Sequence, residues 1–127
     1  RLAGYIPEAD LAAYYQCADL FILPTRLLEG FGLVTLEALA CGTPVLATPV
    51  AANPEIVGRL DSRMLLEDCS PAGIAAGILG FIPRYLENRA AMRGACRKFV
   101  EDNYSWTRYA EGVEQALFDA VSAGRRA

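Results

Sequence analysis

Apolar and polar positions in the first half of the chain alternate between two kinds of segment. Two apolar runs, residues 20–23 and 44–48, lack polar alternation, as expected of parallel strands that are covered on both faces. Two shorter runs, residues 2–6 and 63–67, predict further strands. Apolar residues at helical spacing follow each of the first three runs. They predict helices over residues 8–18, over residues 33–41, and from Pro54 onward with Asn53 as its N-cap.

From residue 71 onward the pattern is helical. It predicts three helices, over residues 71–83, 84–102 and 106–124. The last is the clearest, because Ser105 can cap it and its apolar residues fall on one stripe. We predict that this stripe packs into the core: Trp106, Tyr109, Val113, Leu117, Ala120 and Val121.

Strands that alternate with helices through short loops predict a parallel sheet with helices on both faces. Because crossovers in such sheets are right-handed, the expected class is α/β and Rossmann-like, followed by C-terminal helices. The 127 residues amount to one domain. Ligands of such sheets bind beyond the carboxyl ends of the strands, so function is expected in the loops over residues 24–32 and 48–53.

Composition removes several classes of function. A net charge of −3 argues against a general nucleic-acid binder. The lack of histidine excludes Ser-His-Asp and Cys-His catalysis and every histidine-ligated metal site. No apolar stretch approaches the roughly 20 residues that span a bilayer. The four cysteines form no C-x-x-C pair, so we expect no zinc and buried thiols in a reducing cytoplasm.

One glycine-bearing loop follows a predicted strand and opens a predicted helix. Gly30 and Gly32 allow close approach of a ligand to the backbone, and the first amides of the helix, at Leu33, Val34 and Thr35, are expected to be unpaired and to suit a phosphate. The carboxylates of Glu29 and Glu37 flank this turn and can accept hydrogen bonds from hydroxyl groups of a sugar or ribose. The residues alone leave an alternative open, in which the glycines only shape a turn and Glu29 stabilises the helix start.

Thr25 ends the strand beside this loop. It either contacts the ligand or satisfies the backbone of the loop, and the sequence leaves both interpretations open.

The string EGFGLVTLEALACGTPVLAT, with seven residues between Glu29 and Glu37, resembles the signature of retaining glycosyltransferases of family 4, which have the GT-B fold. GYIP, LAAYYQCADLFILPT and YSWTRYA are similar to other parts of the C-terminal domain of that family. The resemblance therefore covers most of the chain.

The resemblance implies a domain that binds a nucleotide-diphosphate sugar. By it, Glu29 contacts donor-sugar hydroxyls near the anomeric centre, and Glu37 binds the ribose. The backbone over Gly30, Phe31, Gly32, Leu33 and Val34 holds the sugar and diphosphate. It also implies transfer to a hydroxyl acceptor (a glycan, a lipid or a small molecule) with retention of anomeric configuration, and no metal or other cofactor.

Two departures from the family pattern limit this transfer of roles. Ala51-Ala52 stands where the family usually has Gly-Gly, so backbone approach to the donor is less free. The cationic residues that grip the diphosphate and the N-terminal acceptor domain would lie before Arg1. We therefore expect the chain to be part of a longer protein, to need that missing N-terminal domain, and to be inactive alone.

Three alternatives remain. The same loop could serve a non-enzymatic nucleotide or phosphate-binding module, or the domain could be a Rossmann-like interaction module. Arg89, Arg93 and Arg97 recur every four residues and could contact an acidic membrane surface peripherally, or form a solvated face.

Overall fold

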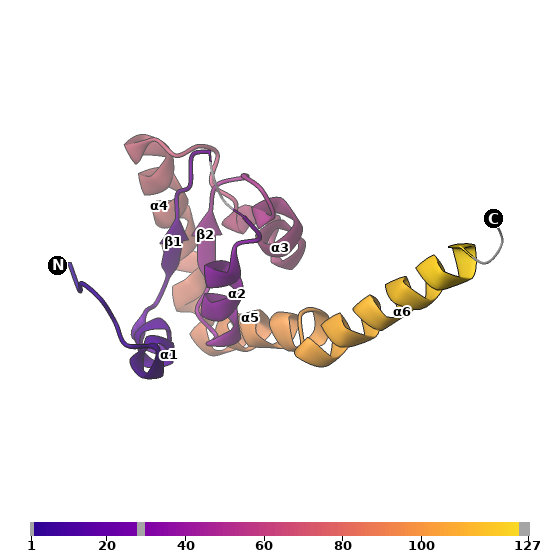
Figure 1. Ribbon diagram of the computed structural model, residues 1–127. Coiled ribbons are helices and arrows are strands. Elements are labelled where there is room, and N and C mark those ends of the chain that lie inside the picture. The colour runs from indigo at the N-terminus through magenta and orange to yellow at the C-terminus, as the bar shows by residue number, and fades with distance from the viewer. Residues whose placement is uncertain (1, 28–29, 125–127) are drawn as a thin grey trace.

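The computed structural model describes residues 2–27 and 30–124 of the chain (Figure 1). The predicted α/β class is confirmed in this part: a small parallel sheet lies among helices, and a long helix ends the chain. The strands are β1 (Phe21–Leu23) and β2 (Val45–Ala47). The helices are α1 (Glu8–Cys17), α2 (Leu33–Ala40), α3 (Asn53–Leu60), the 3₁₀ turn η1 (Ser62–Met64), α4 (Pro71–Glu87), α5 (Arg89–Asn103) and α6 (Trp106–Gly124).

The sheet centres on β2. Phe21 is paired with Val45 and Leu23 with Ala47, so β1 and β2 run parallel. A single parallel bridge joins Ala47 to Leu65 on the other side of β2. All three residues of β2 are buried, which explains its uniformly apolar sequence.

The two shorter predicted strands are absent from the structure. Residues 2–6 form no strand, and Leu2 and Tyr5 are almost fully exposed because no described strand lies beside them. The segment over residues 63–67 begins in η1 and contributes only the bridge at Leu65. The Asp61 carboxylate accepts a hydrogen bond from the Arg63 amide, which favours a tight turn over extended backbone here.

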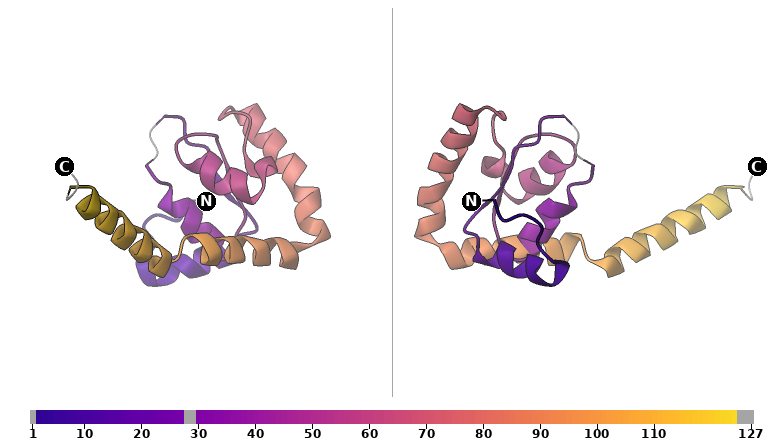
Figure 2. Two further views of the ribbon diagram at one scale, coloured as in Figure 1. Left: turned by 90° about the vertical axis from the view of Figure 1, so that its right-hand side faces the viewer. Right: turned by 60° about the vertical axis from the view of Figure 1, so that its left-hand side comes forward.

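Helices cover both faces of the sheet (Figures 1 and 2). α2 and α3 lie on one face, where the buried side chains of Leu39, Ile56 and Val57 pack. α4 lies on the other face, and a Cβ at Gly77 would overlap a Leu66 methyl and come within 3.8 Å of a Leu46 methyl. Small residues at such a position let the helix approach the sheet closely.

Helix α4 continues through Pro83 to Glu87, so the predicted end of a helix at this proline is wrong. Phe81 and Tyr85, on either side of it, are both buried, and their rings stack with centroids 5.5 Å apart. Their burial offsets the roughly 3 kcal/mol that a proline costs inside a helix. α5 accordingly begins only at Arg89, with Asn88 as its side-chain cap.

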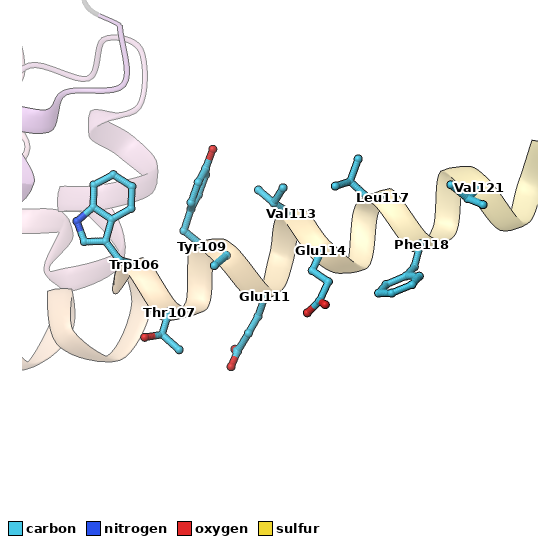
Figure 3. Close-up of a pocket in the computed structure, with 10 residues that line it drawn as sticks. Trp106, Thr107, Tyr109, Glu111, Val113, Glu114, Leu117, Phe118 and Val121 are labelled. Carbon is cyan, nitrogen blue, oxygen red and sulfur yellow. The ribbon is translucent and has the colours of Figure 1, made fainter.

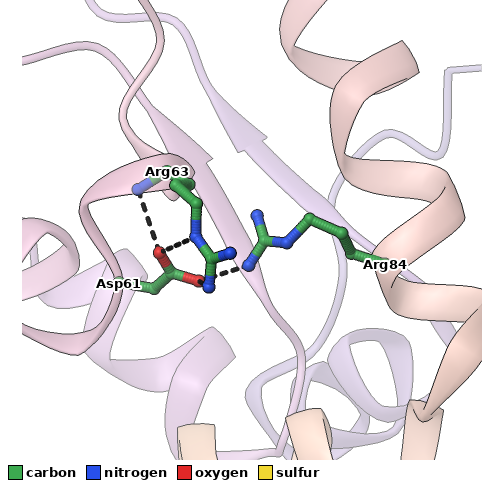
Figure 4. A network of polar contacts seen from close by, with 3 residues as sticks. All are labelled: Asp61, Arg63 and Arg84. Atoms are coloured by element: carbon green, nitrogen blue, oxygen red, sulfur yellow. Dashed lines mark hydrogen bonds and ion pairs between the residues drawn. The ribbon is translucent and has the colours of Figure 1, made fainter.

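A carboxylate at the end of α3 ties this helix to α4 (Figure 4). Asp61 accepts hydrogen bonds from Arg63 Nε at 2.9 Å and from the Arg84 guanidinium. Burial opposes ionisation of this carboxyl group, but the hydrogen bonds from Arg63 and Arg84 prevail and lower its pKa from the ordinary value of an aspartate. The cluster holds the connection after α3 against α4.

Helix α6 projects away from the rest of the molecule, and the prediction that its apolar stripe lies in the core is wrong (Figure 1). Ser105 does cap it, by accepting a hydrogen bond from the Arg108 amide. Trp106 and Tyr109 are 85% and 65% exposed. Figure 3 shows Trp106, Tyr109, Val113 and Leu117 on one side of the helix. The periodicity identified an apolar face correctly, but no other described element covers it.

Candidate functional site

The turn between β1 and α2 lies at the carboxyl end of β1, where the sequence predicts the site. Gly32 takes a left-handed conformation (φ +77°) and precedes the first residue of α2. Its carbonyl accepts hydrogen bonds from the amides of Thr35 and Leu36 at 2.9 and 3.4 Å, so the prediction that the Thr35 amide is unpaired is wrong. The amides of Leu33 and Val34 form no hydrogen bond within the described residues, as expected for the first turn of a helix. Two donors at the positive end of α2 are thus available to an anionic ligand.

Buried polar side chains support this turn from below. The side-chain amide of Asn53 donates through Nδ2 to the Thr48 carbonyl at 3.0 Å, and its Oδ1 atom lies 3.5 Å from Thr35 Oγ1. All three residues are almost completely buried. A Cβ at Gly32 would come within 3.6 Å of Asn53 Oδ1, so the turn rests directly on this group. Buried polar groups with satisfied hydrogen bonds fix a single geometry.

The same group joins the loops that follow the two strands. Thr48, directly after β2, donates through its hydroxyl to the Thr25 carbonyl at 2.6 Å, and its amide donates to the Leu23 carbonyl. The backbone of Thr25 is therefore part of the loop structure, while ligand contact by its side chain stays a prediction. This bond joins the two loops in which the sequence places the function.

Asn53 has a different role from the predicted helix cap. α3 begins at Asn53 itself, its N-cap residue is Ala52, and no side chain caps this end. The side chain instead reaches back to Thr48 and towards Thr35. Sequence reasoning missed Thr48, Thr35 and Asn53 as a group. The available signal was the occurrence of small polar residues directly after a buried strand and beside the glycine turn.

Glu37 lies one turn into α2, four residues after Leu33, so the two lie on the same side of the helix. Its carboxylate is exposed and accepts a hydrogen bond from the Tyr15 hydroxyl at 3.1 Å. Burial and the neighbouring Glu37 carboxylate raise the pKa of Tyr15 to about 12, so the hydroxyl remains a donor at neutral pH. The tyrosine is a site-adjacent residue that the sequence did not single out.

Four of the other predicted contacts are exposed around the turn, whereas Gly32 is buried. Gly30, Phe31, Leu33 and Val34 are all accessible, and the Phe31 ring contacts Tyr104 edge-on with centroids 6.4 Å apart. Glu29, the predicted catalytic acid, lies outside the described residues. The structure therefore brings the predicted backbone donors and Glu37 together on one helix start.

The Ala51-Ala52 departure has a backbone consequence. Ala51 has φ +51°, in the left-handed region that glycine adopts at little cost. The backbone amide of Asn53 donates to the Val50 carbonyl at 3.1 Å across this turn. The chain thus keeps a glycine-like conformation with an alanine in place.

The row of arginines on α5 is engaged with the protein. Arg93 donates to the carbonyls of Gln16 and Ala18 at 2.8 Å each, closing the end of α1. Arg89 stacks over the Tyr85 ring, and Arg97 pairs with Glu101. This pairing favours the interpretation of a solvated, self-paired face, and peripheral membrane contact stays a prediction.

The cysteines differ from the expectation of buried thiols. Cys96 is buried, and burial raises its pKa to about 12, whereas Cys17 is exposed and Cys41 and Cys69 are half-buried. In the described ranges, no three acidic or cysteine side chains are arranged to hold a metal ion. Within residues 2–27 and 30–124, no helix is long and apolar enough to cross a membrane.

The fold is that of an α/β domain, and its candidate ligand site is the turn at the start of a helix beyond a parallel strand. The family model of glycosyl transferases group 1 matches residues 1–99. The chain belongs to this family, so the predicted resemblance is confirmed.

Individual relatives agree with this assignment. The chain is 37% identical over 118 residues to D-inositol 3-phosphate glycosyltransferase of Salinispora arenicola, covering 90% of the chain and 25% of the relative. It is 40% identical over 79 residues to O-antigen chain mannosyltransferase B of Escherichia coli, covering 62% and 20%.

A solved structure is similar over nearly the whole chain. Sucrose-phosphate synthase from Thermosynechococcus elongatus matches with a TM-score of 0.72 and 28% identity, over 97% of the chain and 30% of that protein. The chain therefore spans less than a third of the length of each of these three proteins.

Proposed function

We propose that this chain is the donor-binding part of a retaining glycosyltransferase that takes its sugar from a nucleotide diphosphate. The observation that carries the proposal is the turn at Gly32. It presents two amides with no described partner, at Leu33 and Val34, above a fully hydrogen-bonded buried polar group. Membership of glycosyl transferases group 1 supports it, as does the similarity to a mannosyltransferase and a D-inositol 3-phosphate glycosyltransferase.

Different residues bind the diphosphate, the ribose and the sugar of the donor. The amides at the start of α2 bind the diphosphate, because the helix dipole and two available N–H groups stabilise negative charge there. Glu37 accepts hydrogen bonds from the ribose hydroxyls, and Glu29 from hydroxyls of the donor sugar. Gly30 and Phe31 allow the sugar to lie close to the backbone.

The reaction is a front-face substitution at the anomeric carbon. The acceptor oxygen bonds to this carbon on the side from which the diphosphate leaves. The diphosphate takes the electron pair of the broken C–O bond, and its departing oxygen accepts the proton of the acceptor hydroxyl. The fixed amides of α2 stabilise the negative charge that develops on the diphosphate. A further domain of the complete protein binds the acceptor. The 127 residues alone should therefore transfer no sugar.

A titration tests the proposal. The complete polypeptide that carries this chain is titrated calorimetrically with UDP, GDP and ADP sugars. Glu37→Ala should weaken binding of the preferred nucleotide by about 1 to 3 kcal/mol, because charge-assisted bonds to ribose are lost. Glu87→Ala, an exposed glutamate at the end of α4, is the matched control and should leave the affinity unchanged.

The outcomes separate the alternatives. Binding with transfer to a hydroxyl acceptor supports the enzyme, and binding without transfer by the complete polypeptide indicates a non-enzymatic module. An absence of nucleotide binding would leave a Rossmann-like interaction domain. Sugar transfer by the isolated 127-residue chain would contradict the expected need for a second domain.

A further inference from the structure

The hydroxyl of Tyr15 is the described group that reaches the Glu37 carboxylate, and nothing in the sequence marked this tyrosine as functional. The hydrogen bond is 3.1 Å long and joins α1 to α2. From it we infer that Tyr15 is a positioning residue: it holds Glu37 in the orientation that accepts the ribose hydroxyls of the donor. This inference rests on the function proposed above.

The tyrosine is itself held from two sides. Its ring is half-buried and meets Phe21 of β1 edge-on, with centroids 5.6 Å apart and planes at 85°. Its carbonyl accepts a hydrogen bond from the buried Thr43 hydroxyl, just before β2. The ring is therefore fixed to the sheet, and its hydroxyl cannot follow Glu37 freely.

The end of α1 is fastened as well. The guanidinium of Arg93, on α5, donates to the carbonyls of Gln16 and Ala18 on either side of Cys17. These bonds satisfy carbonyls that the end of a helix would otherwise leave unpaired. The segment that carries Tyr15 is thus anchored at its C-terminal end to the body of the domain.

The hydrogen bond from Tyr15 fixes the orientation of the Glu37 carboxylate. A glutamate on a helix surface samples several rotamers, and ordering it on ligand binding costs free energy. The Tyr15 hydroxyl occupies one site on Glu37 Oε2 and leaves Oε1 and the remaining lone pairs for a ligand. The tyrosine thereby pre-orients the acid before the nucleotide arrives.

The test uses Tyr15→Phe in the complete polypeptide, with UDP, GDP and ADP as ribose-bearing probes and inorganic pyrophosphate as the probe without ribose. We expect about a three- to tenfold weaker binding of the preferred nucleoside diphosphate, because one hydrogen bond to a charged group is lost. Pyrophosphate binding should not change. The 2′,3′-dideoxy form of the same nucleotide should bind wild type and variant equally, since it lacks the hydroxyls that Glu37 accepts.

Tyr14→Phe is the matched control. Tyr14 is the preceding residue, is 53% exposed, and makes no hydrogen bond within the described residues. It should bind all probes as wild type does. A merely structural role of Tyr15 would instead weaken binding of the dideoxy nucleotide and pyrophosphate along with the ribonucleotide.

A cycle with Glu37→Gln separates this inference from the proposed function. If Glu37→Gln leaves nucleotide affinity unchanged, Glu37 does not bind the ribose, and both the proposed role of Glu37 and the positioning role of Tyr15 are overturned. If Glu37→Gln weakens binding but Tyr15→Phe does not, only the positioning role is overturned. Non-additive losses in the double variant support the role, because the two residues would then act through one interaction.

Discussion

The left-handed alanine at residue 51 leads to a prediction of unusual sign: Ala51→Gly should stabilise the domain. A non-glycine residue in this conformation costs about 1 to 2 kcal/mol. Glycine at the same position removes that cost but adds about 0.4 to 1 kcal/mol of chain entropy to the unfolded state. The midpoints of these ranges give a net gain of about 0.8 kcal/mol.

The gain should appear in thermal and urea unfolding followed by circular dichroism. For a chain of 127 residues it corresponds to a rise in Tm of about 2 to 5 °C. Ala76→Gly, at an exposed position inside α4, is the matched control and should lower stability by about 1 kcal/mol. A Tm for Ala51→Gly at or below that of wild type would refute the assignment of backbone strain to this turn.

Three further changes probe the buried polar group at Asn53, the Asp61 carboxylate and the apolar face of α6. Asn53→Ala should lower the free energy of unfolding by about 1 to 3 kcal/mol, measured by urea titration, because the buried Thr48 carbonyl loses its amide partner. The pKa of Asp61 is lowered in the folded state, so its stabilisation is present above pH 3.8 and declines as the pH falls through the lower folded value; Asp61→Asn should flatten this acid limb of the stability profile. The isolated chain should self-associate through the apolar face of α6, and Leu117→Lys should reduce its mass in sedimentation velocity.

Each of these has an outcome that contradicts it. An Asn53→Ala variant as stable as wild type would mean that water replaces the amide. An acid limb unchanged by Asp61→Asn would assign the pH dependence to other carboxyl groups. A monomeric wild-type chain at high concentration would show that the α6 face is tolerated in solvent.

The elements near the site could be predicted from the sequence because their patterns are local. Buried apolar runs marked β1 and β2, and the glycine turn followed by a helical pattern marked the start of α2. The strand directions followed from the short helical crossovers. The predicted backbone donors lie where the order of elements required them.

The failures have tertiary causes. Pro83 remains helical because Phe81 and Tyr85 pack on both sides of it, which local propensity does not contain. The stripe on α6 has the period of a core helix, but a period does not say whether a partner is present. The hydrogen bond between Tyr15 and Glu37 joins residues 22 positions apart, and no short motif encodes it.

The bonds that build the candidate site close short loops. Thr35 and Asn53 are 18 positions apart, Tyr15 and Glu37 are 22 apart, and Thr25 and Thr48 are 23 apart. Because the entropy lost on closing a loop grows with its length, these contacts form at low cost relative to contacts that involve α5. The turn at Gly32 should therefore take shape early as the chain leaves the ribosome, before the C-terminal helices emerge.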